Sequence, residues 1–189
     1  MTMPMIGAVL AGGSSTRMGR PKALLRIGEE TLLERAVGVL VSRFDEIIVC
    51  GGQDSPRGIV LVPDVVESAG PLAGIEAALE YGQGRDILVL AVDLPLVTSA
   101  VIDRLAAPLF AGQVRVARGN GRIQPLLGGY TADLLGLVRA HRMSDDRSVM
   151  GLVRDVPHLT LVDVDPGSLV NINTPADLKL VESARPARP

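Results

Sequence analysis

The sequence has 189 residues, a length typical of one α/β domain. Hydrophobic residues make up 47% and aromatic residues only 2%, which predicts an aliphatic core and argues against an aromatic platform for stacking single-stranded bases. The net charge of −2 argues against a general binder of nucleic acids or membrane surfaces, because such proteins need a basic face.

The chain shows no feature of a secreted or membrane-spanning protein. Its one cysteine, Cys50, cannot form an intrachain disulfide, which favours a reducing compartment. The first residues lack the basic region and long apolar stretch of a signal peptide. The longest clean apolar run, residues 87–92, is far shorter than the ~20 residues that cross a bilayer. We therefore expect a cytoplasmic protein.

In the first half of the chain, short apolar runs alternate with amphipathic segments. This pattern predicts a mostly parallel sheet flanked by helices. Thr31 and Glu34 have the spacing of a capping box at the start of a helix. The run at 86–92 is apolar on both sides and predicts a central strand. The predicted strands are Ile6–Leu10, Glu46–Val49, Gly58–Val62 and Asp86–Val92, and the predicted helices are Thr31–Phe44 and Gly70–Tyr81.

The second half is less regular. The step Asn120-Gly121 favours a tight hairpin turn between two strands. The predicted strands are Val114–Ala117, Ile123–Gly128 and Thr160–Val164, and the predicted helices are Ser99–Leu109, Thr131–Arg142, Val149–Asp155 and one that begins at Thr174. No internal repeat or long linker divides the chain, so residues 1–189 are expected to form a single three-layer α/β domain.

The loop after the first strand is rich in glycine and positive charge. Gly12 and Gly13 allow a sharp turn that brings backbone N–H groups close to a ligand. Arg17, Arg20 and Lys22 add three positive charges within six residues, which suits a triphosphate better than a single carboxylate. The loop has neither the dinucleotide fingerprint nor the Gly-Lys-Ser/Thr step of the P-loop, so it is a third kind of phosphate loop.

Two carboxylates follow apolar strands and are expected at the same edge of the sheet as this loop. Asp93 follows the predicted central strand, and a carboxylate that faces phosphates usually binds them through a divalent metal. An alternative is that Asp93 only caps the following loop. Asp64 follows the strand that ends at residue 62. It could contact a base or ribose, support a metal from outside its ligand sphere, or cap a turn.

Four segments resemble, in the same order, the motifs of molybdenum cofactor guanylyltransferases, which are nucleotidyltransferases with a Rossmann-like α/β fold. Residues 10–25 resemble the family's nucleotide-binding signature. The sequence Gly-Pro-Leu-Ala-Gly at 70–74, Val-Asp-Leu-Pro at 92–95 and Asn-Ile-Asn-Thr-Pro at 171–175 resemble three further family elements. The resemblance runs from residue 6 to about residue 180, almost the whole chain.

This resemblance implies transfer of GMP from GTP to the phosphate of a molybdenum-pterin cofactor, with release of pyrophosphate. The N-terminal half would bind the nucleotide and the C-terminal half the acceptor. The implied nucleotide-binding residues are Leu10, Ala11, Gly12, Gly13, Lys22, Asp64 and Asp93. The implied catalytic residues are Lys22, Asp93 and Arg17, with Mg²⁺ as the cofactor on Asp93.

For the acceptor, the resemblance implies Gly74, Gln124, Asn171 and Asn173. The family often has a His-Pro pair where this chain has Gln124-Pro125. A glutamine cannot act as a base or carry charge, so Gln124 is expected to supply hydrogen bonds. We expect a monomer, with an accessory GTPase and client molybdoenzymes as candidate partners.

Four other functions are alternatives to guanylyl transfer. The nearest is a cytidylyltransferase that acts on the same pterin, although relatives that use CTP tend to read Ala-Ala-Gly in the first loop. A sugar-phosphate nucleotidyltransferase is usually longer. A nucleotide-binding regulator without catalysis would keep the glycine loop but could lose Asp93. An NAD-dependent oxidoreductase is disfavoured because the dinucleotide fingerprint is absent.

Overall fold

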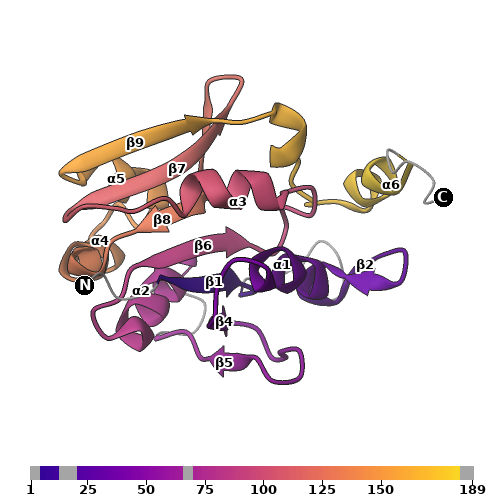
Figure 1. Cartoon of the computed structure of the whole chain (residues 1–189), viewed down its shortest axis with the longest axis horizontal. Coiled ribbons are helices and arrows are strands. Elements are labelled where there is room, and N and C mark those ends of the chain that lie inside the picture. The colour runs from indigo at the N-terminus through magenta and orange to yellow at the C-terminus, as the bar shows by residue number, and fades with distance from the viewer. Residues whose placement is uncertain (1–4, 13–20, 66–69, 184–189) are drawn as a thin grey trace.

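The computed structural model describes residues 5–12, 21–65 and 70–183. Within these residues, seven strands form a central sheet in the order β5-β4-β1-β6-β8-β7-β9 (Figure 1). Their bounds are Ile6–Leu10 (β1), Ile47–Cys50 (β4), Val60–Val62 (β5), Ile87–Ala91 (β6), Gln113–Gly119 (β7), Arg122–Tyr130 (β8) and His158–Asp163 (β9). Strands β5, β4, β1 and β6 are parallel, β8 is antiparallel to both neighbours, and β7 pairs with β9 in parallel. The expected mostly parallel sheet, with β6 in the middle, is confirmed.

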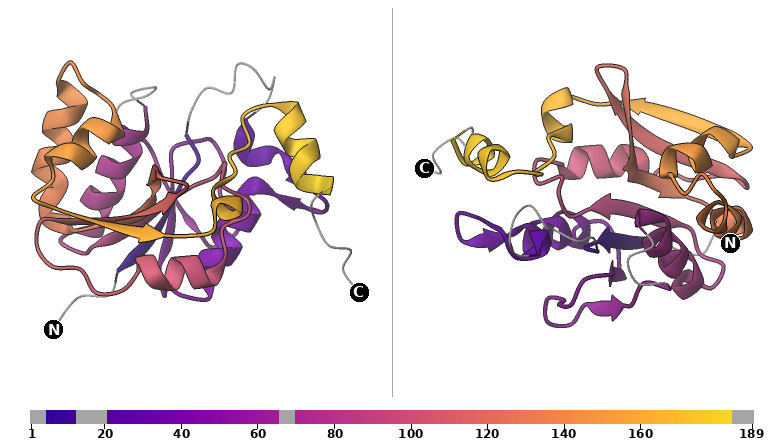
Figure 2. Two further views of the ribbon diagram at one scale, coloured as in Figure 1. Left: turned by 90° about the horizontal axis from the view of Figure 1, so that it is seen from above. Right: turned by 180° about the vertical axis from the view of Figure 1, so that it is seen from behind.

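Helices cover both faces of this sheet, as Figure 2 shows. Their bounds are Leu32–Val41 (α1), Pro71–Gly82 (α2), Ser99–Leu105 (α3), Leu135–Met143 (α4), Val149–Asp155 (α5) and Pro175–Ser183 (α6). Alternate residues of β1 point to opposite faces: Val9 packs with α1 and α3, whereas Ala8 packs with α2, α4 and α5. The three-layer α/β fold is therefore confirmed.

Two local signals in the sequence form the structures that they predict. The Thr31 side chain accepts a hydrogen bond from the Glu34 N–H, and the Glu34 carboxylate accepts one from the Thr31 N–H, which completes the capping box of α1. Asn120 and Gly121 both have positive φ, 48° and 74°, as a tight turn between twisted strands requires. They join β7 to β8 in the expected hairpin.

Other predicted boundaries were wrong. The helix expected over 99–109 ends at Leu105, three residues before Pro108, because proline disfavours helical backbone in the residue before it. The helix expected from Thr131 begins as a 3₁₀ turn, Ala132–Leu134, before α4. A small hairpin, β2 (Arg26–Ile27) with β3 (Glu30–Thr31), was not predicted.

The C-terminal segment returns from the far edge of the sheet to its middle. After β9, a 3₁₀ turn at Pro166–Leu169 leads to an extended stretch in which the Ile172 N–H donates to the Asp93 carbonyl at 2.9 Å. Helix α6 then packs beside β2, beyond the carboxyl ends of β1 and β6 (Figure 1). Among the described helices, none has the length and apolar content needed to cross a membrane.

Candidate functional site

Backbone hydrogen bonds bring the carboxyl ends of four strands to one edge of the sheet. The Ala11 N–H donates to the Cys50 carbonyl at 2.9 Å, and the Val92 N–H donates to the Leu10 carbonyl at 3.1 Å. The Gly51 N–H donates to the Val62 carbonyl at 3.0 Å. The start of the glycine loop therefore lies between the strand ends that lead to Asp64 and Asp93, as the parallel topology predicts.

Asp64 occupies a notch formed by three glycines. A Cβ atom at Gly51 would lie 2.9 Å from both carboxylate oxygens of Asp64, and one at Gly12 would lie 3.0 Å from Oδ2. Gly51 also has a φ of +70°, which favours glycine. A Cβ at Gly74 would lie 3.5 Å from Oδ1 and 3.0 Å from the Leu10 side chain. Small residues on three elements thus make room for one carboxylate beside the glycine loop.

Burial shapes the ionisation of this notch. Burial raises the pKa of Asp64. It also raises the pKa of the neighbouring Cys50 thiol to about 12, with a further contribution from the negative charge of Asp64. Cys50 is therefore a neutral core residue at physiological pH and not a nucleophile.

Lys22 and Asp93 are in direct contact, although 71 positions separate them in the sequence. Lys22 opens the 3₁₀ turn Lys22–Leu24, and its Nζ lies 3.1 Å from Asp93 Oδ2. The same Nζ donates to Asn173 Oδ1 at 2.7 Å. The two charged side chains keep 25% and 21% of their surface exposed, so a ligand can reach them. The 3₁₀ turn, the segment after the central strand and the C-terminal segment thus meet at one ammonium group.

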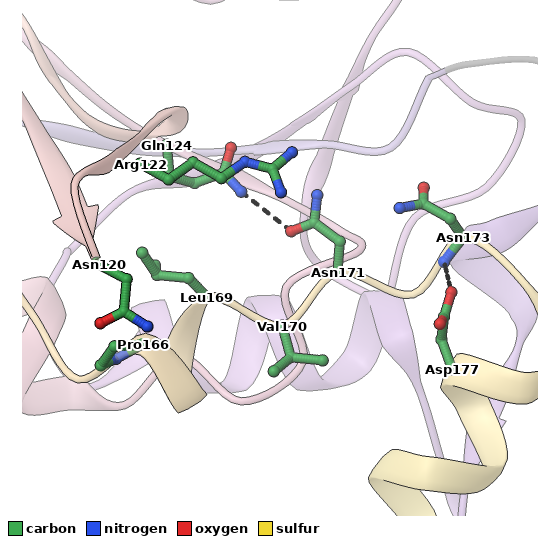
Figure 3. Close-up of a pocket in the computed structure, with 10 residues that line it drawn as sticks. Asn120, Arg122, Gln124, Pro166, Leu169, Val170, Asn171, Asn173 and Asp177 are labelled. Atoms are coloured by element: carbon green, nitrogen blue, oxygen red, sulfur yellow. Dashed lines mark hydrogen bonds between the residues drawn. The ribbon is translucent and has the colours of Figure 1, made fainter.

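Gln124 and Asn171 form a second group. Gln124 Nε2 donates to Asn171 Oδ1 at 3.0 Å (Figure 3). They line an open pocket of about 480 Å³ between the tip of the β7–β8 hairpin and the C-terminal segment. Its other lining residues are Gly119, Asn120, Arg122, Pro166, Leu169, Val170, Asn173 and Asp177. Asn173 lines this pocket and also contacts Lys22, so the two groups are adjacent.

The glycine notch, the contacts of Lys22 and the pocket together contain most of the predicted site residues. Leu10 and Ala11 are buried at the end of β1, and Gly12 is exposed. Gly13 and Arg17 lie outside the described residues. Gly74, which was expected near the acceptor, lies on α2 against Leu10 and Asp64.

Some lining residues were not predicted. Gly51 is essential to the notch, and the pair Gly51-Gly52 after an apolar strand is a signal that could have indicated it. Asn120 was predicted only as a turn residue and Arg122 was not singled out, since nothing near them in the sequence indicates that the hairpin tip faces the C-terminal segment. Among the described residues, no group of three or more His, Cys, Asp or Glu side chains could hold a metal.

A three-layer α/β fold with a glycine turn, a lysine and a carboxylate at the carboxyl edge is the arrangement of a nucleotidyltransferase. Residues 7–160 match the family model described as MobA-like NTP transferase domain. The chain belongs to this family and is an enzyme of the nucleotidyltransferase class.

Two named relatives are similar to the chain over most of its length, and one solved structure shares its fold. A protein of Pelotomaculum thermopropionicum named "Probable molybdenum cofactor guanylyltransferase" is 33% identical over 183 residues, which cover 91% of this chain and 89% of that protein. One of the same name from Mycolicibacterium paratuberculosis is 36% identical over 194 residues, covering 97% and 98%. The structure of molybdopterin-guanine dinucleotide biosynthesis protein A from Archaeoglobus fulgidus shares the fold, with a TM-score of 0.76, 24% identity and coverage of 95% and 97%.

Proposed function

We propose that this protein transfers GMP from GTP to the phosphate of a molybdenum-pterin cofactor and releases pyrophosphate. The names of its relatives support this reaction. The observation that carries it is the contact between Lys22 Nζ and Asp93 Oδ2 at 3.1 Å, next to the start of the glycine loop. A cation and a carboxylate at this edge can together hold a metal-bound triphosphate.

On the nucleotide side, the backbone of Leu10, Ala11, Gly12 and Gly13 would contact GTP, and Asp64 would bind its nucleoside part. Lys22 and Arg17 would hold the phosphates. The glycine notch supports the role of Asp64, because it places a carboxylate that can accept hydrogen bonds directly beside Gly12. Gly74 serves this side indirectly, since its lack of a side chain leaves space for Asp64.

Asp93 would hold a divalent cation, which we propose is Mg²⁺. A single carboxylate suits Mg²⁺, because this ion often takes one or two carboxylates and completes its shell with substrate phosphates and water. When bound, the ion would neutralise charge on the phosphates of GTP and on the departing pyrophosphate. Lys22 would add a second positive charge at the same place.

On the acceptor side, Gln124, Asn171 and Asn173 would bind the pterin cofactor in the pocket beside the hairpin tip. The reaction needs no strong base, because a phosphate monoester is already ionised near neutral pH, with a second pKa of about 6. The difficulty is the repulsion between two anions. Catalysis therefore depends on position and on neutralisation of charge, and Gln124 can contribute hydrogen bonds without ionising.

To test this proposal, the protein is incubated with Mg²⁺, the pterin acceptor and either GTP, CTP or ATP, and the release of pyrophosphate is measured. We expect release with GTP, and a fall of at least about a hundredfold in turnover for Lys22→Ala and Asp93→Ala, the scale on which electrostatic stabilisation acts. Release with CTP alone would indicate a cytidylyltransferase. Binding of GTP without turnover would indicate a regulator, and normal turnover in either folded variant would contradict the assigned roles.

A further inference from the structure

Three consecutive residues of the C-terminal segment join the acceptor pocket to the phosphate-binding lysine. Asn171 Oδ1 accepts a hydrogen bond from Gln124 Nε2 in the pocket. Ile172 is fully buried, and its N–H donates to the Asp93 carbonyl at 2.9 Å. Asn173 Oδ1 accepts a hydrogen bond from Lys22 Nζ at 2.7 Å. The buried residue fixes the segment, and the two asparagines on either side of it have different partners.

Asn173 is itself held firmly. Its N–H donates to Asp177 Oδ2 at 2.9 Å, and the Thr174 N–H donates to the same oxygen at 2.8 Å. The Asp177 N–H in turn donates to Thr174 Oγ1 at 3.2 Å. These bonds form a reciprocal cap at the start of α6, and Figure 3 shows the link from Asn173 to Asp177. The backbone that carries the Asn173 side chain is therefore fixed on both sides.

A fixed, neutral oxygen is well suited to orient a lysine. The ammonium group of lysine sits on a flexible four-carbon stem, and ordering this stem costs rotamer entropy. A hydrogen-bond acceptor on a rigid segment orders the lysine stem before the nucleotide binds, so less rotamer entropy is lost on binding. Because a carboxamide carries no charge, it orients the ammonium group without adding a negative charge that would compete with the phosphates.

We infer that Asn173 is a positioning residue for Lys22 in nucleotide binding, in addition to lining the acceptor pocket. Asn171, two residues earlier, serves the acceptor through Gln124. The inference rests on the proposed function, because it takes Lys22 to be the ligand of the GTP phosphates. It assigns the two asparagines of one motif to two different substrates.

The test measures GTP affinity in the presence of Mg²⁺ and in the absence of acceptor, by isothermal titration calorimetry. We expect Asn173→Ala to weaken GTP binding roughly fivefold to tenfold, the scale of one hydrogen bond. Asn171→Ala is the matched variant: it should leave the Kd for GTP within about twofold and raise the KM for the acceptor. Asn173 is exposed, so its variant should fold, which thermal unfolding checks.

A double-mutant cycle separates positioning from an independent contact. If Asn173 acts through Lys22, then adding Asn173→Ala to Lys22→Ala should weaken GTP binding no further. Additive losses, or an unchanged Kd in Asn173→Ala, would overturn the inference while the proposed function stands. A wild-type protein that binds no GTP would instead overturn the proposed function, and the assigned role with it.

Discussion

At the scale of single residues, one ammonium group and one carboxylate hold each other in the place where we propose that substrate and metal bind. Lys22 Nζ contacts Asp93, the carboxylate that we propose would hold a divalent cation. In the nucleotide-free protein, the lysine therefore opposes the entry of a divalent cation. When a triphosphate is present, Lys22 has a second partner, and the opposition falls. Binding of metal and of nucleotide should thus be coupled.

This coupling predicts an increase of metal affinity in a variant that loses turnover. Lys22→Ala should raise the affinity of the nucleotide-free protein for Mn²⁺ roughly threefold to fivefold, on the scale of a partly exposed ion pair. Electron paramagnetic resonance of free Mn²⁺ measures this. Lys179→Ala, the variant of the only other lysine, should leave the affinity unchanged. Equal or weaker binding by Lys22→Ala would contradict the coupling.

The ionised Asp64 carboxylate should lower the stability of the folded protein, although we propose that it binds the nucleotide. Because burial raises the pKa of Asp64, the folded protein holds this proton more tightly than the unfolded chain does, and stability is lost as pH rises through the folded pKa. Asp64→Asn should therefore raise the Tm by about 1–2 °C at pH 7 while it weakens GTP binding. The gain should vanish below the ordinary aspartate value of 3.8.

The control for this prediction removes the same charge elsewhere. Asp45 is exposed at the amino end of β4, opposite to the notch, so Asp45→Asn should change neither the Tm nor GTP binding. Calorimetric scans between pH 3 and pH 8 compare the variants. A lower Tm for Asp64→Asn at pH 7 would show that the notch stabilises the ionised carboxylate.

At the scale of elements, an irregularity in the β7–β8 hairpin places Gln124. The pairing jumps from Val116 with Gly128 to Ala117 with Gln124, so β8 carries extra residues. Pro125 lies in this bulge and has no N–H to donate to a neighbouring strand. The buried Tyr130 hydroxyl donates to the Pro125 carbonyl at 2.5 Å and supports the bulge from within the core. Bulges of this kind direct side chains into sites.

The bulge predicts an effect at a distance from the pocket. Tyr130→Phe leaves the Pro125 carbonyl without this donor, which should cost about 1–2 kcal/mol and lower the Tm by about 3–6 °C. Because the bulge carries Gln124, the KM for the acceptor should rise, and the KM for GTP should not. Tyr81→Phe is the matched control. The Tyr81 hydroxyl donates to Glu46, which precedes β4, and β4 lies on the opposite side of β6 from the β7–β8 hairpin. An unchanged KM for the acceptor in Tyr130→Phe would show that the Tyr130 hydroxyl does not help to position Gln124 for acceptor binding.

The elements show which parts of the site a sequence can reveal. The neighbourhood of the glycine loop, Asp64 and Asp93 follows from one rule, that parallel strands end at the same edge, and the strands were recognisable from their apolar runs. The hairpin turn at Asn120-Gly121 is equally local. The contact of Lys22 with Asn173 spans 151 positions and depends on the path of the C-terminal segment, which no local pattern encodes. The bulge at Pro125 depends on the register in which β8 pairs with β7, which the local sequence does not show.

At the scale of the whole molecule, surface carboxylates determine how stability depends on pH. Among the residues that the structure describes, five have hydrogen bonds or ion pairs that lower their pKa in the folded state: Glu34, Glu46, Asp146, Asp163 and Asp177. Burial raises the pKa of two others, Asp64 and Asp86. A lowered folded pKa contributes stability that is present above the unfolded value and lost as pH falls through the folded value. A raised pKa has the opposite effect.

Because the carboxylates with a lowered pKa outnumber those with a raised pKa, we expect the protein to lose stability in acid. The ordinary values of these groups are 3.8 for aspartate and 4.5 for glutamate, so the Tm should change little between pH 6 and 8 and fall as the pH drops below about 4.5. The Arg118 guanidinium donates to both Asp163 oxygens at 2.7 and 2.8 Å and is the main cause of the low pKa of Asp163. Asp163→Asn should therefore lose less stability over the same range. A Tm that stays constant or rises towards pH 3 in the wild type would mean that Asp64 and Asp86 outweigh the paired surface groups.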